Sequence, residues 1–372
     1  MILMHLEKIY LKNMNYKDEL EKIYNAKSPI YDNLDKEIVL YGAGSLGHMG
    51  LDLLKKSGIL PKYIVDKNKS GEIDGVEIIA PDEIPLEDKQ EKLFLVCIST
   101  IPYNDIVDFL ISLGIKNILQ FYTYAYIKFP KLLSNGWFVS ELTEADKENI
   151  DRVCEILSHD ETSIHHYLQF LWWKLRGIEK IYEEFPVLSG KKYFKTEICK
   201  NLKDNEILLD VGCHFGQTIE SFSNITNNKY KEIVAIEPDK YNLEICKNKF
   251  NDKRIKYLNI ALSDKKEERK FIDNLGYASK LDEKGNTTIQ IETIDSLNLK
   301  PTIIKLHTEG EELNILKGAS ETIKAYKPKL MVLADHNDDG LYKIPLLMYN
   351  YGYKLYFNLH DYCGNTAVFY GE

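Results

Sequence analysis

The segment Thr302–Glu312, TIIKLHTEGEE, places an amine, an imidazole, a carboxylate and a glycine directly after a short apolar run. These residues are Lys305, His307, Glu309 and Gly310. The apolar run predicts a buried strand, and the carboxyl ends of strands in open α/β sheets are where ligands bind. A histidine can accept a proton near neutral pH. We therefore expect this strand to end in an active site.

A second polar strand end occurs in LLDVGCHFGQT, where a strand ends at Asp210 and a turn follows with Gly212 and Gly216. Glycines let the backbone of such a turn approach a ligand closely. The spacing Asp-x-Gly-x-x-x-Gly differs from the dinucleotide fingerprint, so no pyrophosphate is expected here. A carboxylate at this strand end would suit the ammonium group of an amino acid.

The next two strand ends supply further polar groups. Glu237 in AIEPD can accept hydrogen bonds from both hydroxyls of a ribose. Ser263 and Asp264 in NIALSD would then lie near the exocyclic amine of an adenine. An aminoacyl group, a ribose and an adenine together describe S-adenosylmethionine.

A separate glycine motif lies near the N-terminus in YGAGSLG. Gly42, Gly44 and Gly47 fit Gly-x-Gly-x-x-Gly between a predicted strand and a predicted helix, and Asp66 ends the next strand. The free N–H groups of the helix N-terminus would receive a phosphate. Two alternatives stay open here: a site for a nucleotide or nucleotide sugar, and a degenerate scaffold used for oligomer contacts.

The alternation of strands and helices predicts an α/β fold with two Rossmann-like doubly wound sheets joined by a helical connector. In the second sheet, residues 255–264 and 288–297 are expected to supply strands, and the last two strands are expected to pair as an antiparallel hairpin. Residues 141–185 are expected to be helical throughout. The predicted segments are an N-terminal domain over 1–130 with a leading helix over 1–30, the connector over 131–200, and a C-terminal domain over 201–372.

Composition excludes several classes of protein. The net charge of −9 argues against broad binding to nucleic acid or anionic membranes. The sequence contains no apolar run long enough for a membrane span and no secretory signal. None of the six cysteines lies in a Cys-x-x-Cys pair, so neither a zinc ribbon nor a redox dithiol is indicated. Scattered free thiols suit a reducing cytoplasm. We expect a cytoplasmic protein.

Residues 193–372 resemble the FkbM family of S-adenosylmethionine-dependent methyltransferases. The block with Lys-x-x-x-Glu-Gly-x-Glu and Leu-Lys-Gly-Ala is the most specific part of the resemblance. The matching segments are YF at Tyr193-Phe194, DVGCHFGQT, AIEPD, NIALSD, IETIDSL, IIKLHTEGEELNILKGASETI and YKPKLMVLADH. The helical connector also looks like that of bacterial members with an N-terminal Rossmann-like domain.

The resemblance implies a class I methyltransferase domain that O-methylates a sugar or a nucleotide-linked sugar, in surface polysaccharide or natural-product biosynthesis. Its cofactor would be S-adenosylmethionine, and its acceptor a saccharide or another small molecule. The general base would be His307 first, with Glu309 and His336 next, and Lys305 would anchor a charged group of the substrate. The cofactor-binding positions would be Asp210, Gly212, His214, Gly216, Thr218, Glu237, Ala261, Ser263 and Asp264.

Two positions depart from the family pattern. The family usually has Asp where this chain has His307, and His214 fills a position that varies within the family. Simpler interpretations also stand: Glu309 as a helix cap, and His307 and His336 as ordinary strand-end histidines. No metal is expected, because HNDDG and His360-Asp361 match no known cation loop.

Two other functions are kept as alternatives. One is an oxidoreductase that binds NAD or a nucleotide sugar at the N-terminal glycine turn. The other is a degenerate methyltransferase that binds ligands without catalysis, as the His307 departure would allow. A monomer and a homo-oligomer both remain open.

Overall fold

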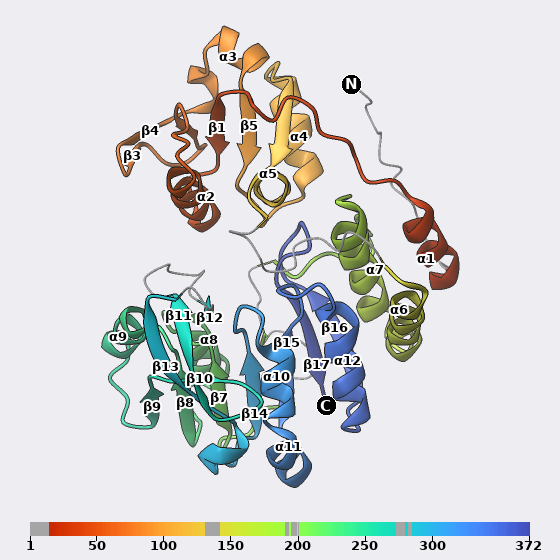
Figure 1. The fold of residues 1–372 in the computed structure, drawn as a ribbon, viewed down its shortest axis with the longest axis vertical. Helices are drawn as coiled ribbons and strands as arrows, with labels where there is room; N and C mark the ends of the chain where they lie inside the picture. Colours follow the sequence, from red (N-terminus) through yellow and green to blue (C-terminus); the bar gives the residue numbers. More distant parts are fainter. Residues whose placement is uncertain are drawn as a thin grey trace. The chain divides into compact units, whose positions relative to one another are not determined.

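The computed structural model describes residues 15–130, 142–189, 193–194, 199, 201–272, 280–281 and 285–372 (Figure 1). The chain divides into two compact units that each draw on distant parts of the sequence. Unit 1 contains residues 1–141, 165–190 and 361–365, and unit 2 contains residues 142–164, 191–360 and 366–372. This division does not test the predicted domain limits at residues 130 and 200, which stay predictions.

Unit 1 is built on a six-stranded sheet in the order β3-β4-β2-β1-β5-β6, in which only β3 runs antiparallel to its neighbour. The strands are β1 Ile38–Tyr41, β2 Ile64–Val65, β3 Gly71–Ile73, β4 Val76–Ile79, β5 Leu93–Val96 and β6 Asn117–Gln120. Successive residues of β1 belong to different apolar clusters, so both faces of the sheet are covered. The helices are α1 Tyr16–Asn25, α2 Ser45–Lys56, η1 Pro81–Glu83, α3 Leu86–Glu91, α4 Tyr103–Ser112 and α5 Phe121–Lys128.

Two expected helices are shorter than predicted. The leading helix ends at Asn25, and residues 1–14 of its predicted range lie outside the described residues. The segment 141–185 is not helical throughout: it forms α6 Glu144–Leu157 and α7 Glu161–Arg176, followed by turns. Gly177 ends α7 because it adopts φ +66° and donates its N–H to the carbonyl of Trp173 at 2.8 Å.

Unit 2 contains a seven-stranded sheet in the order β16-β17-β15-β14-β7-β8-β9. The five strands from β15 to β9 are parallel, while β17 is antiparallel to both β15 and β16, so the predicted hairpin is confirmed. The α/β class is confirmed for both sheets. The strands are β7 Ile207–Val211, β8 Glu232–Ile236, β9 Ile255–Leu258, β14 Ile303–Leu306, β15 Lys329–Leu333, β16 Leu355–Leu359 and β17 Ala367–Gly371.

The helices of unit 2 that follow these strands begin just past the strand tips, as the alternating pattern predicts. Glycine turns or polar loops precede them. They are α8 Gln217–Ile225, α9 Lys240–Lys249, α10 Glu312–Lys317 and α12 Gly340–Asn350. Unit 2 also contains α6, η4 Asp295–Leu297 and α11 Ser320–Tyr326, which do not follow strands of this sheet.

A second, four-stranded sheet in unit 2 corrects the sequence-based interpretation. The predicted strand over 255–264 is two strands, and its second half leaves the main sheet. The small sheet has the order β10-β13-β11-β12. Side chains alternate between exposed and partly buried along β11 and β13, which leaves one face to solvent, as is usual for an antiparallel pair. The strands are β10 Ala261–Leu262, β11 Glu267–Ile272, β12 Lys280–Leu281 and β13 Thr287–Glu292.

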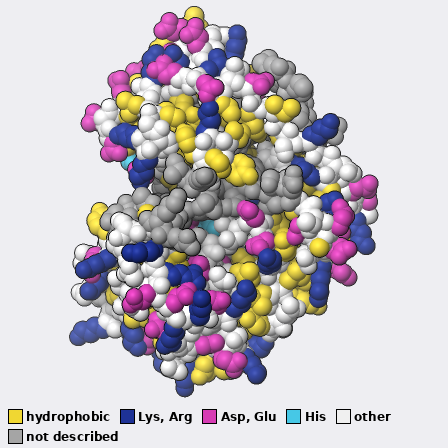
Figure 2. Space-filling view, in the orientation of Figure 1, with side chains coloured by type: hydrophobic (Ala, Val, Ile, Leu, Met, Phe, Trp, Pro, Cys, Tyr) yellow, Lys and Arg dark blue, Asp and Glu magenta, His cyan; other side chains and the backbone are white. Residues whose placement is uncertain are grey.

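Figure 2 shows acidic and basic side chains interspersed over the described part of the visible face. This mixture is what a chain with a modest net negative charge is expected to present. Among the described helices, none has the length and apolar character that a bilayer crossing requires.

The tip of β14 presses directly on the glycine turn after β7. A Cβ atom added to Gly212 would lie 1.8 Å from the carbonyl oxygen of His307, and Gly212 has φ +73°. Gly352 has a similar φ of +82°, but the nearest atom to its added Cβ is the flexible Lys327 Nζ at 3.5 Å. Both glycines have a left-handed backbone conformation, but only at Gly212 would an added Cβ atom clash with another part of the backbone.

We predict that Gly212→Ala lowers the free energy of unfolding more than Gly352→Ala does, by about 1–3 kcal/mol, because only the first adds an overpacking cost to the left-handed strain. Urea unfolding of both variants measures the difference. Equal losses in the two variants would contradict the close packing of the β14 tip on the turn.

Candidate active site

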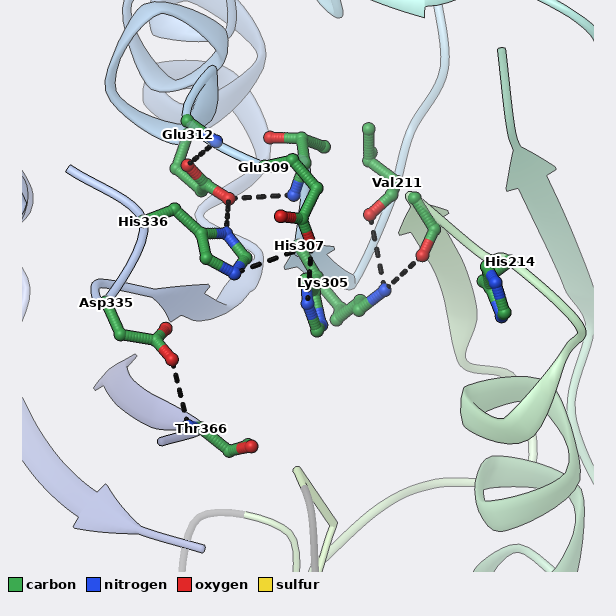
Figure 3. Close-up of polar contacts among 12 residues, drawn as sticks. Val211, His214, Lys305, His307, Glu309, Glu312, Asp335, His336 and Thr366 are labelled. Carbon is green, nitrogen blue, oxygen red and sulfur yellow. Dashed lines mark hydrogen bonds and ion pairs between the residues drawn. The ribbon is translucent and has the colours of Figure 1, made fainter. Parts of the chain in front are cut away.

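Three side chains predicted to do chemistry meet beyond the tips of β14 and β15 (Figure 3). The carboxylate oxygen Oε1 of Glu309 lies 3.6 Å from Nε2 of His307 and 3.5 Å from Nε2 of His336. One ligand atom from each of the three residues lies within 4.8 Å of the others. The structure thus brings together the three residues that the sequence offered as alternative bases.

An unusual backbone conformation aims the Glu309 carboxylate. Glu309 has φ +53° and Gly310 has φ +112°, so the chain reverses immediately after β14. A left-handed conformation costs a residue with a side chain roughly 1–2 kcal/mol. Such strain persists where the surrounding structure enforces it, often at functional sites. Here the reversal turns Glu309 back between the two imidazoles (Figure 3).

Glu309 is not the N-cap of α10, since that position is Glu311, and the loop before the helix is held by Glu312. The Glu312 carboxylate is fully buried and accepts the N–H groups of Thr308 at 2.7 Å and Gly310 at 3.0 Å. Burial works to raise the pKa of Glu312, but the hydrogen bond and charge of His336 and the N–H of Thr308 hold it below its ordinary value.

His336 is buried and surrounded by carboxylates. Its Nδ1 donates to Oε1 of Glu312 at 3.2 Å. Burial alone would lower the pKa of the imidazole, but the charges of Glu309 and Asp335 and the bond to Glu312 raise it to about 10. Asp335 itself is fixed by the N–H of Thr366, which donates to its Oδ2 at 2.9 Å. The raised pKa favours the protonated ring, which makes His336 a weaker candidate than His307 for a general base.

His307 is the more accessible imidazole. Its side chain is 31% exposed, against 5% for His336. Its Nδ1 is hydrogen-bonded to the hydroxyl of Tyr193 at 2.8 Å, which fixes the ring with Nε2 toward Glu309. The ring is thus oriented on both sides, as a proton acceptor or a metal ligand requires.

Lys305 has a different role from the one predicted. It is buried, and its Nζ lies 2.9 Å from Oδ1 of Asp210, its direct neighbour in the β14–β7 register. The same Nζ donates to the carbonyls of Gly212 at 2.7 Å and Val211 at 3.3 Å (Figure 3). Lys305 therefore holds the start of the glycine turn through buried contacts. Asp210 is likewise fully buried, with its carboxylate directed to Lys305.

The glycine turn and the Glu237 carboxylate form one continuous edge. Glu237 follows β8, and its Oε2 accepts the N–H of His214 at 2.9 Å, while Oε1 accepts that of Asp239 at 3.0 Å. Burial raises the pKa of Glu237 to about 7. His214 has φ +48°, and burial and the charge of Lys305 lower its pKa to about 4, so its ring is neutral.

The remaining predicted cofactor residues are placed unevenly. Gly216 is the N-cap of α8 with φ +80°, and Thr218 in its first turn is buried. Ala261 is buried in β10, and Ser263 is buried with its hydroxyl donating to Glu311 at 2.8 Å. Asp264 is exposed. Of the three predicted residues at this tip, Asp264 alone is exposed.

The N-terminal glycine motif has the expected turn, and Asp66 stabilises it from within. Gly42 has φ +112°. Oδ2 of Asp66 accepts the N–H of Ala43 at 2.7 Å, and Oδ1 accepts those of Asn68 and Lys69. A Cβ atom on Gly47 would lie 2.0 Å from the carbonyl oxygen of Gly42, so Gly47 serves close packing. Gly44 has no atom within 4 Å of an added Cβ and leaves the turn open there.

Sequence reasoning missed Glu312 and Asp335 as partners of the histidines. Asp335 directly precedes His336, and Glu312 lies in the same loop as Glu309. Neither was singled out, because acidic residues beside a strand end are usually solvated. Tyr193 was noted for the resemblance without a role. Only the folded chain brings its hydroxyl to His307.

Comparisons with known proteins agree with this arrangement. Residues 210–355 match the sequence model of the methyltransferase FkbM domain, a segment shorter than half the chain that contains the glycine turn, Glu237 and the histidine cluster. No curated protein sequence matches the chain.

Among solved structures, methyltransferase FkbM from Methylobacillus flagellatus KT is similar over 96% of this chain and 98% of its own, with a TM-score of 0.66 and 18% identity. That likeness shows the fold. A precorrin-6y C5,15-methyltransferase from Geobacter metallireducens matches 51% of this chain and 93% of its own, with a TM-score of 0.31 and 13% identity. The second similarity is too distant to carry an argument.

We predict that Lys305→Met lowers the free energy of unfolding by about 3–5 kcal/mol, because it leaves the buried Asp210 carboxylate without its counter-charge. Lys329→Met on the neighbouring strand β15 is the matched control. It breaks only the partly exposed pair with Glu372 and should cost at most about 1 kcal/mol. Chemical unfolding measures both. Similar small losses would mean that the Lys305–Asp210 pair does not hold the turn.

Proposed function

We propose that the chain is an S-adenosylmethionine-dependent methyltransferase that methylates a hydroxyl group, most plausibly of a sugar or a nucleotide-linked sugar. The observation that carries the proposal is the hydrogen bond between Glu237 and the His214 N–H. It links the carboxylate that would bind a ribose to the glycine turn, at the carboxyl edge of the sheet. Both groups lie within the segment that matches the FkbM domain.

The residues present fit such a cofactor. Gly212 and Gly216 let the turn backbone come close to the methionine end, and the carboxylate of Glu237 is the acceptor for ribose hydroxyls. Lys305 neutralises the Asp210 carboxylate and also donates to the carbonyl of Gly212. The buried ion pair would therefore support the methionine end of the cofactor by fixing the glycine turn. When bound, the cofactor supplies a methyl group on an electrophilic sulfonium.

The chain's own contribution is to position the acceptor oxygen and take up its proton. In this proposal Nε2 of His307 accepts the proton, with Glu309 stabilising the imidazolium that forms. Tyr193 keeps the ring in place. His336 fixes Glu309 through its charge.

The acceptor class and the compartment remain proposals. The proposal of a saccharide acceptor rests on the FkbM resemblance. Because the turn is open at Gly44, a nucleotide or nucleotide sugar stays among the candidate ligands of the N-terminal turn. A cytoplasmic location is in keeping with six cysteines that form no disulfide.

We predict that wild-type protein binds S-adenosylhomocysteine in calorimetry and that Glu237→Gln weakens this binding about tenfold or more. Hydrogen bonds to a charged group contribute about 1.5–3 kcal/mol each. Glu232→Gln, at the opposite end of β8, is the control and should bind as the wild type does, because Glu232 pairs with Lys256 at the surface.

Parallel titrations with S-adenosylmethionine, NAD and a panel of nucleotide sugars separate the alternatives. Absence of binding by both adenosyl ligands would overturn the proposal. Binding of NAD alone, abolished by Asp66→Ala, would favour the oxidoreductase. Binding of S-adenosylhomocysteine without methyl transfer to any acceptor would favour the non-catalytic alternative.

A further inference from the structure

We propose that His307, Glu309 and His336 form a binding site for one divalent cation of the borderline class, such as Zn²⁺, through Nε2 of each histidine and Oε1 of the glutamate. This departs from the sequence-based expectation of no metal. It is also distinct from the HNDDG and His360-Asp361 stretch that the sequence analysis considered for a cation. The proposal concerns the binding of an ion by this chain and does not depend on methyl transfer.

The distances suit such an ion. Oε1 of Glu309 lies 3.6 Å from Nε2 of His307 and 3.5 Å from Nε2 of His336. Bonds of about 2.0–2.2 Å in a tetrahedral site place neighbouring ligand atoms about 3.4 Å apart. The group as a whole falls within 4.8 Å, so small side-chain rotations complete the site.

Each ligand is also held from behind. Metal-binding histidines usually give their second ring nitrogen to a carboxylate or another polar group, which fixes the ring and raises its basicity. Here Nδ1 of His336 contacts Glu312 at 3.2 Å and Nδ1 of His307 contacts the Tyr193 hydroxyl at 2.8 Å. Both Nε2 atoms are thereby turned toward the same carboxylate oxygen (Figure 3). The strained backbone of Glu309 aims that carboxylate.

The charges favour a cation as well. Glu309, Glu312 and Asp335 place three carboxylates around the buried His336. A divalent ion bound there would offset two of these negative charges. The side chains of His307 and Glu309 are 31% and 19% exposed, so an ion can enter from solvent.

Two histidines and one carboxylate are a donor set used by Zn²⁺ and Fe²⁺ sites that keep open positions for other ligands. A hard ion such as Mg²⁺ prefers oxygen ligands and should bind poorly. If the proposed methyl transfer holds, an open position would bind the acceptor oxygen and promote loss of its proton to solvent water. With the ion bound, His307 Nε2 would be a ligand, and the base role proposed above would belong to the ion-free site.

The test is calorimetric titration of tag-free, chelator-treated full-length protein with Zn²⁺, with Co²⁺ absorption spectra as a second readout. We expect one ion per chain and a visible Co²⁺ spectrum. His307→Ala and Glu309→Gln should each raise the Kd at least tenfold, and Glu312→Gln about tenfold through loss of ring orientation. Glu309→Gln keeps the side-chain volume, so its effect does not depend on refolding of the loop.

His159→Ala is the control, because this exposed histidine lies at the end of α6 and should leave Zn²⁺ binding unchanged. The proposal is overturned if Zn²⁺ does not bind, if the ligand variants bind it as the wild type does, or if Mg²⁺ binds equally tightly. S-adenosylhomocysteine titrations of the same samples test the methyltransferase proposal separately, because that compound is proposed to bind at Glu237 and not at this cluster.

Discussion

The candidate site depends on the buried ion pair between Lys305 and Asp210. The two residues are direct partners in the β14–β7 register, and both are removed from solvent. Burial of two charges is costly unless their remaining hydrogen-bonding capacity is satisfied. Lys305 meets this condition by donating to the carbonyls of Val211 and Gly212. Asp210 meets it only in part: its carboxylate has the Lys305 charge at 2.9 Å, but neither oxygen has a hydrogen-bond partner among the described residues. The pair thus fixes the first residues of the glycine turn to the strand that carries the histidine cluster.

Two chemically different half-sites extend from this pair. On one side, the turn continues to His214, whose N–H joins it to the Glu237 carboxylate. On the other side, β14 ends in His307, which Gly212 allows to pack directly on the turn. An electrophile held at the first half-site and an acceptor held at the second would meet where β7 and β14 adjoin. Sites at the carboxyl ends of adjacent parallel strands follow this logic.

Much of the fold was predictable because its signals are local. Apolar runs that end in glycine turns identified the main sheet, and the short spacing of the last strands identified the hairpin. The small sheet was missed because β10 lies only two residues beyond β9, too close for sequence to reveal a change of sheet. The end of α7 was missed because one residue, Gly177, decides it through a left-handed conformation.

The site residues show the same division. His307, Glu309 and His336 were each identified from polar strand ends, but their convergence depends on the pairing of β14 with β15. The role of Lys305 could not be read from its type, because a lysine that serves a substrate and one that holds a turn differ only in burial. Glu312 was overlooked for a similar reason, since its hydrogen bonds exist only after the loop reverses at Glu309.

The most direct test of the account is a crystal structure of the protein grown with S-adenosylhomocysteine and Zn²⁺, with anomalous diffraction at the zinc edge. The account predicts the ribose on Glu237 and one anomalous peak between His307, Glu309 and His336. The nucleoside bound at the Gly42 turn, or zinc bound only elsewhere, would contradict it.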